Sequence, residues 1–269
     1  MDRPFVHYHV LTMIHSRPGR INPARSLRAD ALAHLLGAGL LSLATAALLA
    51  SGGGFGLQGF LLTALLAALS GAVLLAALPE ALPGNRFGRA NSVTLGRLAL
   101  TCVLAGALAG EQTLGTLGSG TAWSLCLIAG LSLLLDGLDG WLARRYGEAT
   151  SFGARFDMEA DALFLLVVAL LVAATGKAGA WVLLSGLWRY GFVALGWLWP
   201  RLRGALPESA RRKRVFVAQA LLLIVCLAPP VTPTLGAALA CTGLLLLSLS
   251  FLLDLLWLLR RSPTGGSTR

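Results

Sequence analysis

Charged residues are scarce in this sequence, and the scarcity excludes an ordinary water-soluble fold. Only 13% of the 269 residues are charged, whereas 56% are hydrophobic and the mean hydropathy is +0.75. Soluble domains carry about 25% charged residues. A chain of this size cannot bury so much apolar surface in water, but a bilayer accepts it directly. The composition therefore predicts a polytopic membrane protein.

Paired cysteines and basic stripes with interleaved aromatic residues are also absent. The four cysteines, Cys102, Cys126, Cys226 and Cys241, lie inside apolar runs and form no Cys-x2-Cys pair. This favours buried packing thiols over a disulfide or a zinc site. The formal net charge of +10 comes from short basic clusters between apolar runs. Cytoplasmic membrane loops have this arrangement, so we expect no nucleic-acid partner.

Long apolar runs make up most of the chain. We expect an all-α protein with about eight transmembrane helices, because eight runs approach the ~20 residues that cross ~30 Å of hydrocarbon. They are Ala31–Ala50, Leu57–Leu78, Val93–Ala109, Ala122–Leu142, Phe156–Ala174, Ala178–Trp199, Val215–Val231 and Leu235–Leu259. The seventh contains Pro229-Pro230 near its end, and we expect it to be tilted or short.

Lysine and arginine are divided unevenly between alternate loops. If the N-terminus is cytoplasmic, all 22 Lys and Arg except Lys177 and Arg189 fall on the cytoplasmic side. The positive-inside rule then predicts a multi-pass protein of the plasma (inner) membrane with both termini cytoplasmic. We expect residues 1–30 to form a basic tail on anionic lipid.

Acidic residues are few, and half of them are concentrated in one stretch. Six of the 12 fall between Asp136 and Asp161, although acids in membrane segments are costly and usually functional. Asp136 and Asp139 are three residues apart, and Asp157 and Asp161 are four apart, so each pair shares one helix face. Two antiparallel helices joined by the turn at 144–152 would aim four carboxylates at one point.

Four carboxylates at one point repel one another and need cations. Oxygen-only ligands select hard ions such as Mg²⁺ or Mn²⁺. Each residue taken singly has a structural alternative, because a lone Asp near a helix end is often a cap and small residues in membrane helices usually serve packing. Buried carboxylates would also suit an ion- or proton-coupled transporter, which is the alternative function. A non-catalytic scaffold would not explain a complete set of metal ligands.

The order of these residues is more specific than the residues themselves. They read Asp136-x2-Asp139-Gly140-x2-Ala143-Arg144-x8-Gly153-x3-Asp157-x3-Asp161. This pattern resembles the signature of the CDP-alcohol phosphotransferase (phosphatidyltransferase) family, class I, with every fixed position filled. Upstream, Asn91-x2-Thr94-x2-Arg97 resembles the motif that opens the first core helix of that family. The resemblance extends to about Leu259.

The resemblance implies six core helices, which two additional helices precede here. It divides the chain into a basic cytoplasmic tail (1–30), two extra transmembrane helices (31–79), a phosphotransferase core (80–261) and a flexible C-terminal tail (262–269). It also implies a homodimer, and the contacts rich in Gly and Ala agree with one.

The resemblance assigns roles to individual residues. Two divalent ions, Mg²⁺ or Mn²⁺, are expected, and Asp161 would also be the general base that takes the acceptor's hydroxyl proton. The implied metal ligands are Asp136, Asp139, Asp157 and Asp161. The implied CDP-binding residues are Asn91, Thr94, Asp139, Gly140, Ala143, Arg144, Thr150 and Gly153.

The implied reaction moves a phosphatidyl (or substituted phosphate) group from a CDP-alcohol to a hydroxyl acceptor and releases CMP near the cytoplasmic face. CDP-diacylglycerol is the expected donor. Arg189 and Lys213 are candidate acceptor-binding residues, since an arginine in this region binds the acceptor phosphate in some family members. Arg189 has a structural alternative, which is pairing with a core aspartate or with Glu159.

A phosphatidylglycerophosphate synthase-like reaction is the leading interpretation of the acceptor. Such enzymes usually show a Lys-x-Lys-Thr run before a Gln. Lys213 and Gln219 fit that frame, but Val215 and Phe216 replace the second Lys and the Thr. A CDP-choline-, CDP-ethanolamine- or CDP-inositol-type reaction therefore stays open.

Overall fold

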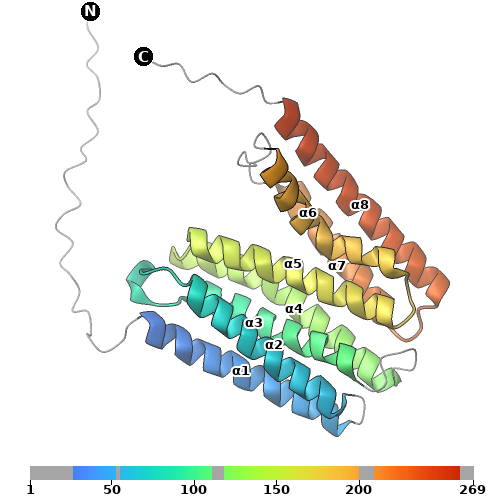
Figure 1. Ribbon diagram of the computed structural model, residues 1–269, viewed down its shortest axis with the longest axis horizontal. Helices are drawn as coiled ribbons and strands as arrows, with labels where there is room; N and C mark the ends of the chain where they lie inside the picture. The colour runs from blue at the N-terminus through green and yellow to red at the C-terminus, as the bar shows by residue number, and fades with distance from the viewer. Residues whose placement is uncertain (1–26, 53–54, 111–117, 200–208, 261–269) are drawn as a thin grey trace, which may run out of the picture.

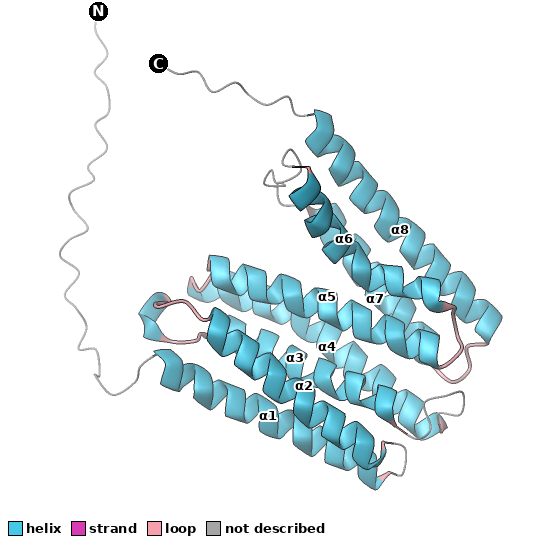
Figure 2. Cartoon of the chain, in the orientation of Figure 1, coloured by secondary structure: helices cyan, strands magenta, loops and turns pink. Residues whose placement is uncertain are grey.

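The computed structural model describes residues 27–52, 55–110, 118–199 and 209–260, and these are helical apart from short loops (Figure 1, Figure 2). Eight α-helices follow one another: α1 Leu27–Ser51, α2 Gly56–Ala77, α3 Arg89–Gly106, α4 Ser119–Tyr146, α5 Ser151–Ala174, α6 Leu184–Leu198, α7 Ala210–Leu227 and α8 Pro233–Arg260. Three short 3-10 helices are η1 Pro83–Asn85, η2 Ala107–Ala109 and η3 Ala180–Leu183. No strand occurs in these ranges, which confirms the predicted all-α class.

Five helices are long and apolar enough to cross a membrane: α1, α2, α3 with η2, α4 and α8. The other three each carry a polar feature or are short. Helix α5 contains Asp157 and Asp161, α7 begins with the basic run Arg211–Arg214, and α6 has 15 residues. Each of the eight predicted segments overlaps one of these α-helices, and the polytopic membrane class is confirmed.

The helices form two groups (Figure 1). Helices α1 to α5 lie roughly side by side, and α6, α7 and α8 lean away from them. Helix α3 is central to the first group, since it contacts α1, α2, α4 and α5. The main core lies where α3, α4, α5 and α7 meet, with Val103, Leu125, Val168 and Leu223 fully buried. Exposed leucines cover α1, α2 and α8, as expected of surfaces that face lipid.

The turn between α4 and α5 sets the relation of the two acidic pairs. Helix α4 ends at Tyr146, and Gly147 follows it with a φ of 66°, a left-handed conformation that glycine adopts without strain. Thr150 then caps α5, because its hydroxyl oxygen accepts the Gly153 N–H at 3.0 Å. The short antiparallel hairpin brings the acidic faces of α4 and α5 together.

The sixth and seventh segments differ from the sequence-based prediction. The predicted sixth helix, Ala178–Trp199, is not a single α-helix, because its start is the 3-10 turn η3. The seventh was predicted as Val215–Val231, but α7 begins at Ala210 and ends at Leu227. Ala228 follows the helix with an extended ψ of 136°, because the residue before a proline is pushed out of the α region.

Three of the four cysteines are buried, and the prediction was wrong for the fourth. Cys102, Cys126 and Cys226 pack inside the bundle, whereas Cys241 is exposed. It lies on α8, which contacts α7 along one side and leaves much of its surface uncovered. The predictions for residues 1–26 and for the tail at 262–269 fall outside the described residues.

Candidate active site

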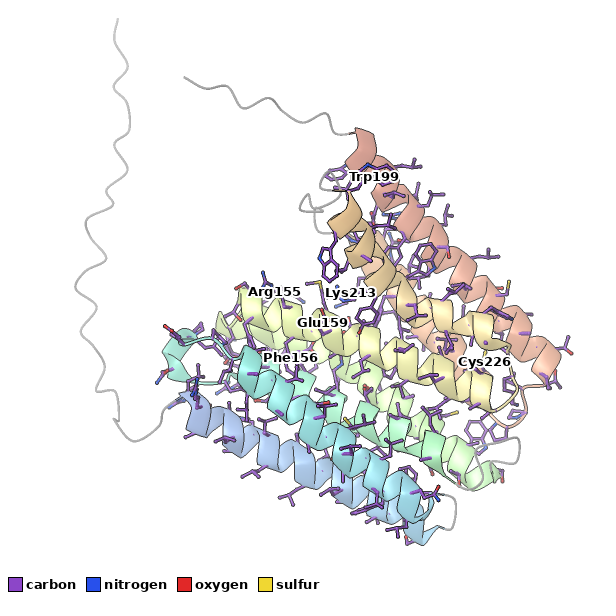
Figure 3. The ribbon with its side chains drawn as sticks, viewed as in Figure 1. Arg155, Phe156, Glu159, Trp199, Lys213 and Cys226 are labelled. Carbon is purple, nitrogen blue, oxygen red and sulfur yellow. The ribbon has the colours of Figure 1, made fainter. Side chains whose placement is uncertain are left out.

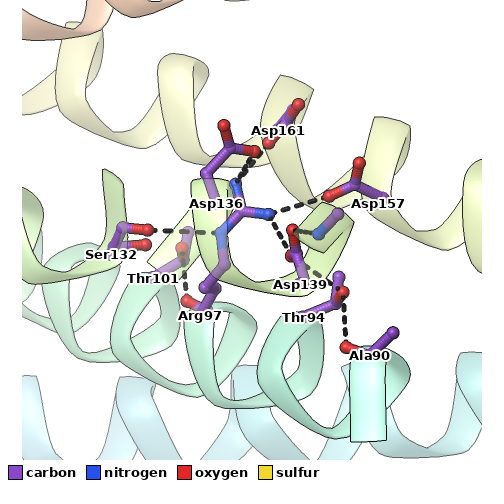
Figure 4. Close-up of polar contacts among 10 residues, drawn as sticks. Ala90, Thr94, Arg97, Thr101, Ser132, Asp136, Asp139, Asp157 and Asp161 are labelled. Carbon is purple, nitrogen blue, oxygen red and sulfur yellow. Dashed lines mark hydrogen bonds and ion pairs between the residues drawn. The ribbon is translucent and has the colours of Figure 1, made fainter. Parts of the chain in front are cut away.

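The four aspartates converge on one buried arginine, Arg97 of α3 (Figure 4). Its guanidinium lies 3.0 Å from Asp136 and 2.8 Å from both Asp139 and Asp157, measured from nitrogen to carboxylate oxygen. It also forms an ion pair with Asp161. Only 2% of the Arg97 side chain is exposed. The carboxylates come from α4 and α5, as their spacing predicted.

Other polar groups hold this arrangement in place. The Nε of Arg97 donates to the carbonyl oxygen of Ser132 on α4 at 3.2 Å. Thr94, one turn earlier on α3, donates its hydroxyl to Asp139 at 3.1 Å. A buried charge is tolerated only when it is paired and hydrogen-bonded, and this one is. Arg97 and Thr94 therefore fix the side chain of Asp139 from two directions.

The acidic cluster has the chemistry of a site for hard cations. Oxygens of Asp136, Asp139 and Asp157 lie within 4.8 Å of one another, and Asp161 joins them through Arg97. One guanidinium is shared by four carboxylates, so the group keeps a surplus of negative charge. An all-oxygen donor set with surplus negative charge suits Mg²⁺ or Mn²⁺. The residues present therefore fit the divalent ions that the family resemblance implies.

The residues predicted to bind CDP lie on α3, on the last part of α4 and at the start of α5. A Cβ built on Gly153 of α5 would lie 2.8 Å from the Asn91 amide oxygen and 3.1 Å from the Thr150 hydroxyl, so a larger residue would collide. These three residues thus meet at the crossing of α3 and α5. On α4, the Arg144 side chain lies over Gly140, with 3.4 Å between a Cβ built there and Nη1.

Exposure differs among these residues. Asn91 and Thr94 are buried, whereas Arg144 is exposed at the end of α4 and Ala143 is partly buried. Asn91 and Thr94 contact Gly153 and Asp139, respectively, from within the bundle. Arg144 is free to reach a ligand that enters from outside the bundle.

A cavity of about 590 Å³ adjoins the cluster and extends between α5 and the group formed by α6, α7 and α8. Its charged lining comprises Asp136, Asp157, Asp161, Arg189, Arg212, Lys213 and Asp254. Its apolar lining includes Leu165, Phe192, Phe216 and Phe251. Carboxylates, basic groups and apolar side chains thus line the same cavity. Figure 3 shows Lys213, and Glu159 of α5, near the junction of the two helix groups.

Both candidate acceptor-binding residues line this cavity. Lys213 is exposed near the start of α7. Arg189 of α6 forms an ion pair with Glu159 of α5, which is the structural alternative considered for it. Its Nη1 also donates to the sulfur of Met158 at 3.8 Å, and its Nε is buried without a partner. Arg189 therefore has both a structural contact and access to the cavity.

Sequence reasoning missed several polar residues of this region. Arg97 was noticed in a motif and taken to favour a phosphatidylglycerophosphate-like reaction, but it was not placed among the four aspartates. Asp254 of α8 is 8% exposed and pairs with Arg211 and with Arg212 at 3.7 Å. Glu148, in the turn after α4, accepts the Ala90 N–H at 3.1 Å. A lone acid in the last apolar segment is a signal that could have drawn attention to Asp254, because such acids need partners.

These features define a polytopic membrane protein with a buried acidic centre that opens on an amphipathic cavity. The family model described as CDP-alcohol phosphatidyltransferase matches residues 87–252, which is more than half of the chain. The chain therefore belongs to the CDP-alcohol phosphatidyltransferase family, as its motifs predicted. It is a transferase of phospholipid biosynthesis that acts on a CDP-alcohol donor and a hydroxyl acceptor. No solved structure matches the chain significantly.

Proposed function

We propose that this protein transfers the phosphatidyl group of CDP-diacylglycerol to a small polyol or polyol phosphate and releases CMP. The observation that carries the proposal is the cluster of four aspartates around Arg97, which opens on a cavity lined by basic and apolar residues. The polar part of this cavity suits a phosphorylated headgroup, and its apolar part suits a lipid. Family membership favours a transferase over the transporter alternative.

Two Mg²⁺ or Mn²⁺ held by Asp136, Asp139, Asp157 and Asp161 would neutralise the pyrophosphate and favour the departure of CMP. In the transfer, the acceptor oxygen forms a bond to the β-phosphorus while the bond from that phosphorus to the bridging oxygen breaks. CMP leaves with the electron pair of the broken bond. The acceptor's proton passes to a carboxylate oxygen of the protein.

Asp161 is the residue that we assign to this proton transfer. It lines the cavity, and its side chain is 23% exposed, whereas those of Asp136 and Asp139 are 7% and 4% exposed. Asp157 also lines the cavity and is 39% exposed, so the choice between these two rests on the family pattern, which gives the base to the position of Asp161. A general base must come within hydrogen-bond reach of the proton it takes. Asp161 is open to an acceptor in the cavity while it still contacts the centre of the acidic cluster.

We propose that CDP binds at the end of the bundle where α3, the end of α4 and the start of α5 meet. The residues that would hold it are Asn91, Thr94, Asp139, Gly140, Ala143, Arg144, Thr150 and Gly153. The support is the close approach at Gly153 together with the contact between Thr94 and Asp139. At Gly153 the space of a Cβ is taken by Asn91 and Thr150, whereas at Gly140 only the Arg144 side chain comes near, which leaves room for a ligand to approach the α4 backbone there.

Replacement of Arg189 by Ala is expected to raise the acceptor KM by about 10- to 100-fold, the usual worth of a hydrogen bond to a charged group. The donor KM should stay near the wild-type value, because Arg189 lies on α6, away from the CDP motif. Glu159→Gln is the matched control, since it removes the ion pair but keeps the arginine. An unchanged acceptor KM in Arg189→Ala, or an equal rise in both variants, would reduce Arg189 to a structural role.

We also propose that the termini and the active site lie on the cytoplasmic side, a proposal that the distribution of Lys and Arg supports. In a variant without native cysteines, Ser262→Cys should resist a membrane-impermeant thiol reagent applied to intact cells. Ser119→Cys, at the opposite end of α4 from the acidic motif, should react. The reverse labelling pattern would refute this orientation. The homodimer stays a prediction, which the molecular mass of the solubilised protein would test.

The function itself is tested by supplying purified protein with CDP-diacylglycerol and a panel of radiolabelled alcohols. We expect CMP release coupled to labelled lipid, with a polyol or polyol phosphate as the preferred acceptor. Release of CMP only from CDP-choline, CDP-ethanolamine or a CDP-inositol-type donor would assign another member of the same chemistry. Absence of CMP release from every CDP-alcohol would refute the proposal.

A further inference from the structure

The α1–α2 hairpin lies outside the residues that match the family, yet it touches the first of them. The match begins at Phe87. Asp30, in the first turn of α1, accepts the backbone N–H of Phe87 at 2.9 Å. The Asp30 side chain is 11% exposed. A hydrogen bond to an ionised carboxylate is about twice as strong as one between neutral groups, so this contact is a firm link between the hairpin and the core.

Phe87 is also fixed by packing. Its side chain is 1% exposed and shares a core cluster with Ala31 of α1 and Leu74 of α2. Its ring lies 5.6 Å from the ring of His34 on α1 and 6.4 Å from that of Phe156 on α5, measured between centroids. Three helices thus hold one aromatic side chain at the entrance to α3.

The segment that follows Phe87 leads directly to the proposed CDP pocket. The Phe87 carbonyl accepts a hydrogen bond from the Asn91 side chain at 2.6 Å, and this fixes the amide that lies against Gly153. Between them, Gly88 has a φ of 89°, which only glycine adopts without strain. Both backbone polar groups of Phe87 are therefore hydrogen-bonded, the N–H to Asp30 and the carbonyl to Asn91.

We propose that Asp30 is a positioning residue for the donor site and that the α1–α2 hairpin braces the segment Phe87–Asn91. The role rests on the proposed function, because it requires Asn91 to line the CDP pocket. Asp30 does not touch the reacting groups. It acts through Phe87, whose position sets that of the Asn91 side chain. Loss of the Asp30 contact frees the Phe87 N–H and lets this segment move relative to Gly153.

The experiment compares Asp30 variants of the full-length protein in lipid nanodiscs. Asp30→Ala removes the acceptor and should raise the donor KM by about tenfold, in line with the loss of one charge-assisted hydrogen bond. The acceptor KM and kcat should change by less than about twofold if the loss stays confined to this bond. Backbone hydrogen exchange in residues 86–91 should become faster. Asp30→Asn keeps an acceptor oxygen in place and should restore most of the donor affinity.

Thr63→Ala is the matched control. Thr63 of α2 is fully buried against Gly106 of α3, so its loss loosens the hairpin without touching Phe87. It should lower the melting temperature and leave the donor KM unchanged. Asp30→Glu moves the carboxylate by one methylene and keeps its charge. It should also raise the donor KM, and it serves as the test if Asp30→Ala does not fold.

Unchanged exchange in residues 86–91 would overturn the role of Asp30, as would a donor KM that stays at the wild-type value. An equal rise of the donor KM in Thr63→Ala would overturn it too, because the effect would then be general loosening. Failure of the wild-type protein to release CMP would refute the proposed function and this role together. If the wild-type protein releases CMP and the Asp30 variants keep its donor KM and its exchange rates in residues 86–91, this role alone would be refuted.

Discussion

Asp161→Asn is expected to lower turnover by about 10²- to 10⁴-fold, the usual worth of general-base catalysis, and to leave donor binding nearly intact. Asparagine keeps the size of the side chain and one ligating oxygen, but it cannot take the acceptor's proton. Asp161 faces the cavity and is more exposed than Asp136 or Asp139. Asp157 is also open to the cavity, and the family pattern places the base at the position of Asp161. Steady-state turnover and donor affinity of the purified variant measure the two effects separately.

Asp139→Asn provides the comparison. Asp139 is 4% exposed and is held by Thr94 and Arg97, so it belongs to the interior of the cluster. Its replacement should weaken the binding of metal and nucleotide as well as turnover. Two results would remove Asp161 from the role of base. One is near-normal turnover of Asp161→Asn, and the other is loss of turnover only because nucleotide no longer binds.

Arg97→Met is expected to lower the free energy of unfolding by about 3–5 kcal/mol in the absence of divalent ions, the usual cost of removing one partner of a buried ion pair. The reason is that Arg97 neutralises charge on four carboxylates at once. Divalent ions should compensate in part, because a ligand that binds only the folded state stabilises it by mass action. Melting temperatures in EDTA and in Mn²⁺ measure both effects.

Arg189→Met is the control for Arg97→Met. Its ion pair with Glu159 is more exposed, at 27% and 56% of the two side chains, and such pairs contribute about 0–1 kcal/mol. Its melting temperature should change little and should not depend on Mn²⁺ more than that of the wild type. Wild-type stability of Arg97→Met in EDTA would show that the carboxylates do not need the guanidinium. A melting temperature that Mn²⁺ fails to raise would argue against a metal site.

The membrane class, the helical fold and the family could be predicted because their signals are local. Apolar runs predict the helices, and carboxylates within such runs indicate a polar centre. The spacing of Asp136 and Asp139, and of Asp157 and Asp161, sets which faces they occupy whatever the rest of the bundle does. The structure indeed brings these four side chains together.

The features that the sequence did not predict depend on contacts between distant segments. That Arg97 reaches four carboxylates follows from the crossing of α3 with α4 and α5. Gly186 of α6 approaches the backbone of Leu166 on α5, with 2.5 Å between a Cβ built there and the Leu166 Cα. Apolar periodicity shows neither this crossing nor the 3-10 turn at the start of the sixth segment. The pairing of Asp254 with α7 is likewise a tertiary contact.

The sequence predicts the donor chemistry more closely than the acceptor alcohol, and the reason is physical. The residues proposed to hold CDP and metal belong to a motif of set spacing, whereas the cavity lining comes from separate helices. The basic side chains proposed to bind the acceptor, Arg189 and Lys213, would recognise a phosphate without specifying the alcohol attached to it. The Arg189 and Glu159 variants therefore address acceptor charge, and the panel of alcohols addresses acceptor identity.

The dependence of CMP release on divalent ions tests the proposed chemistry most directly. Purified protein is stripped with EDTA and assayed with CDP-diacylglycerol and the preferred acceptor, before and after addition of Mn²⁺ or Mg²⁺. Because the four carboxylates carry surplus negative charge at the centre of the site, we predict that release falls to background in EDTA and returns with either ion. Full activity in EDTA would contradict a metal-dependent transfer at these aspartates.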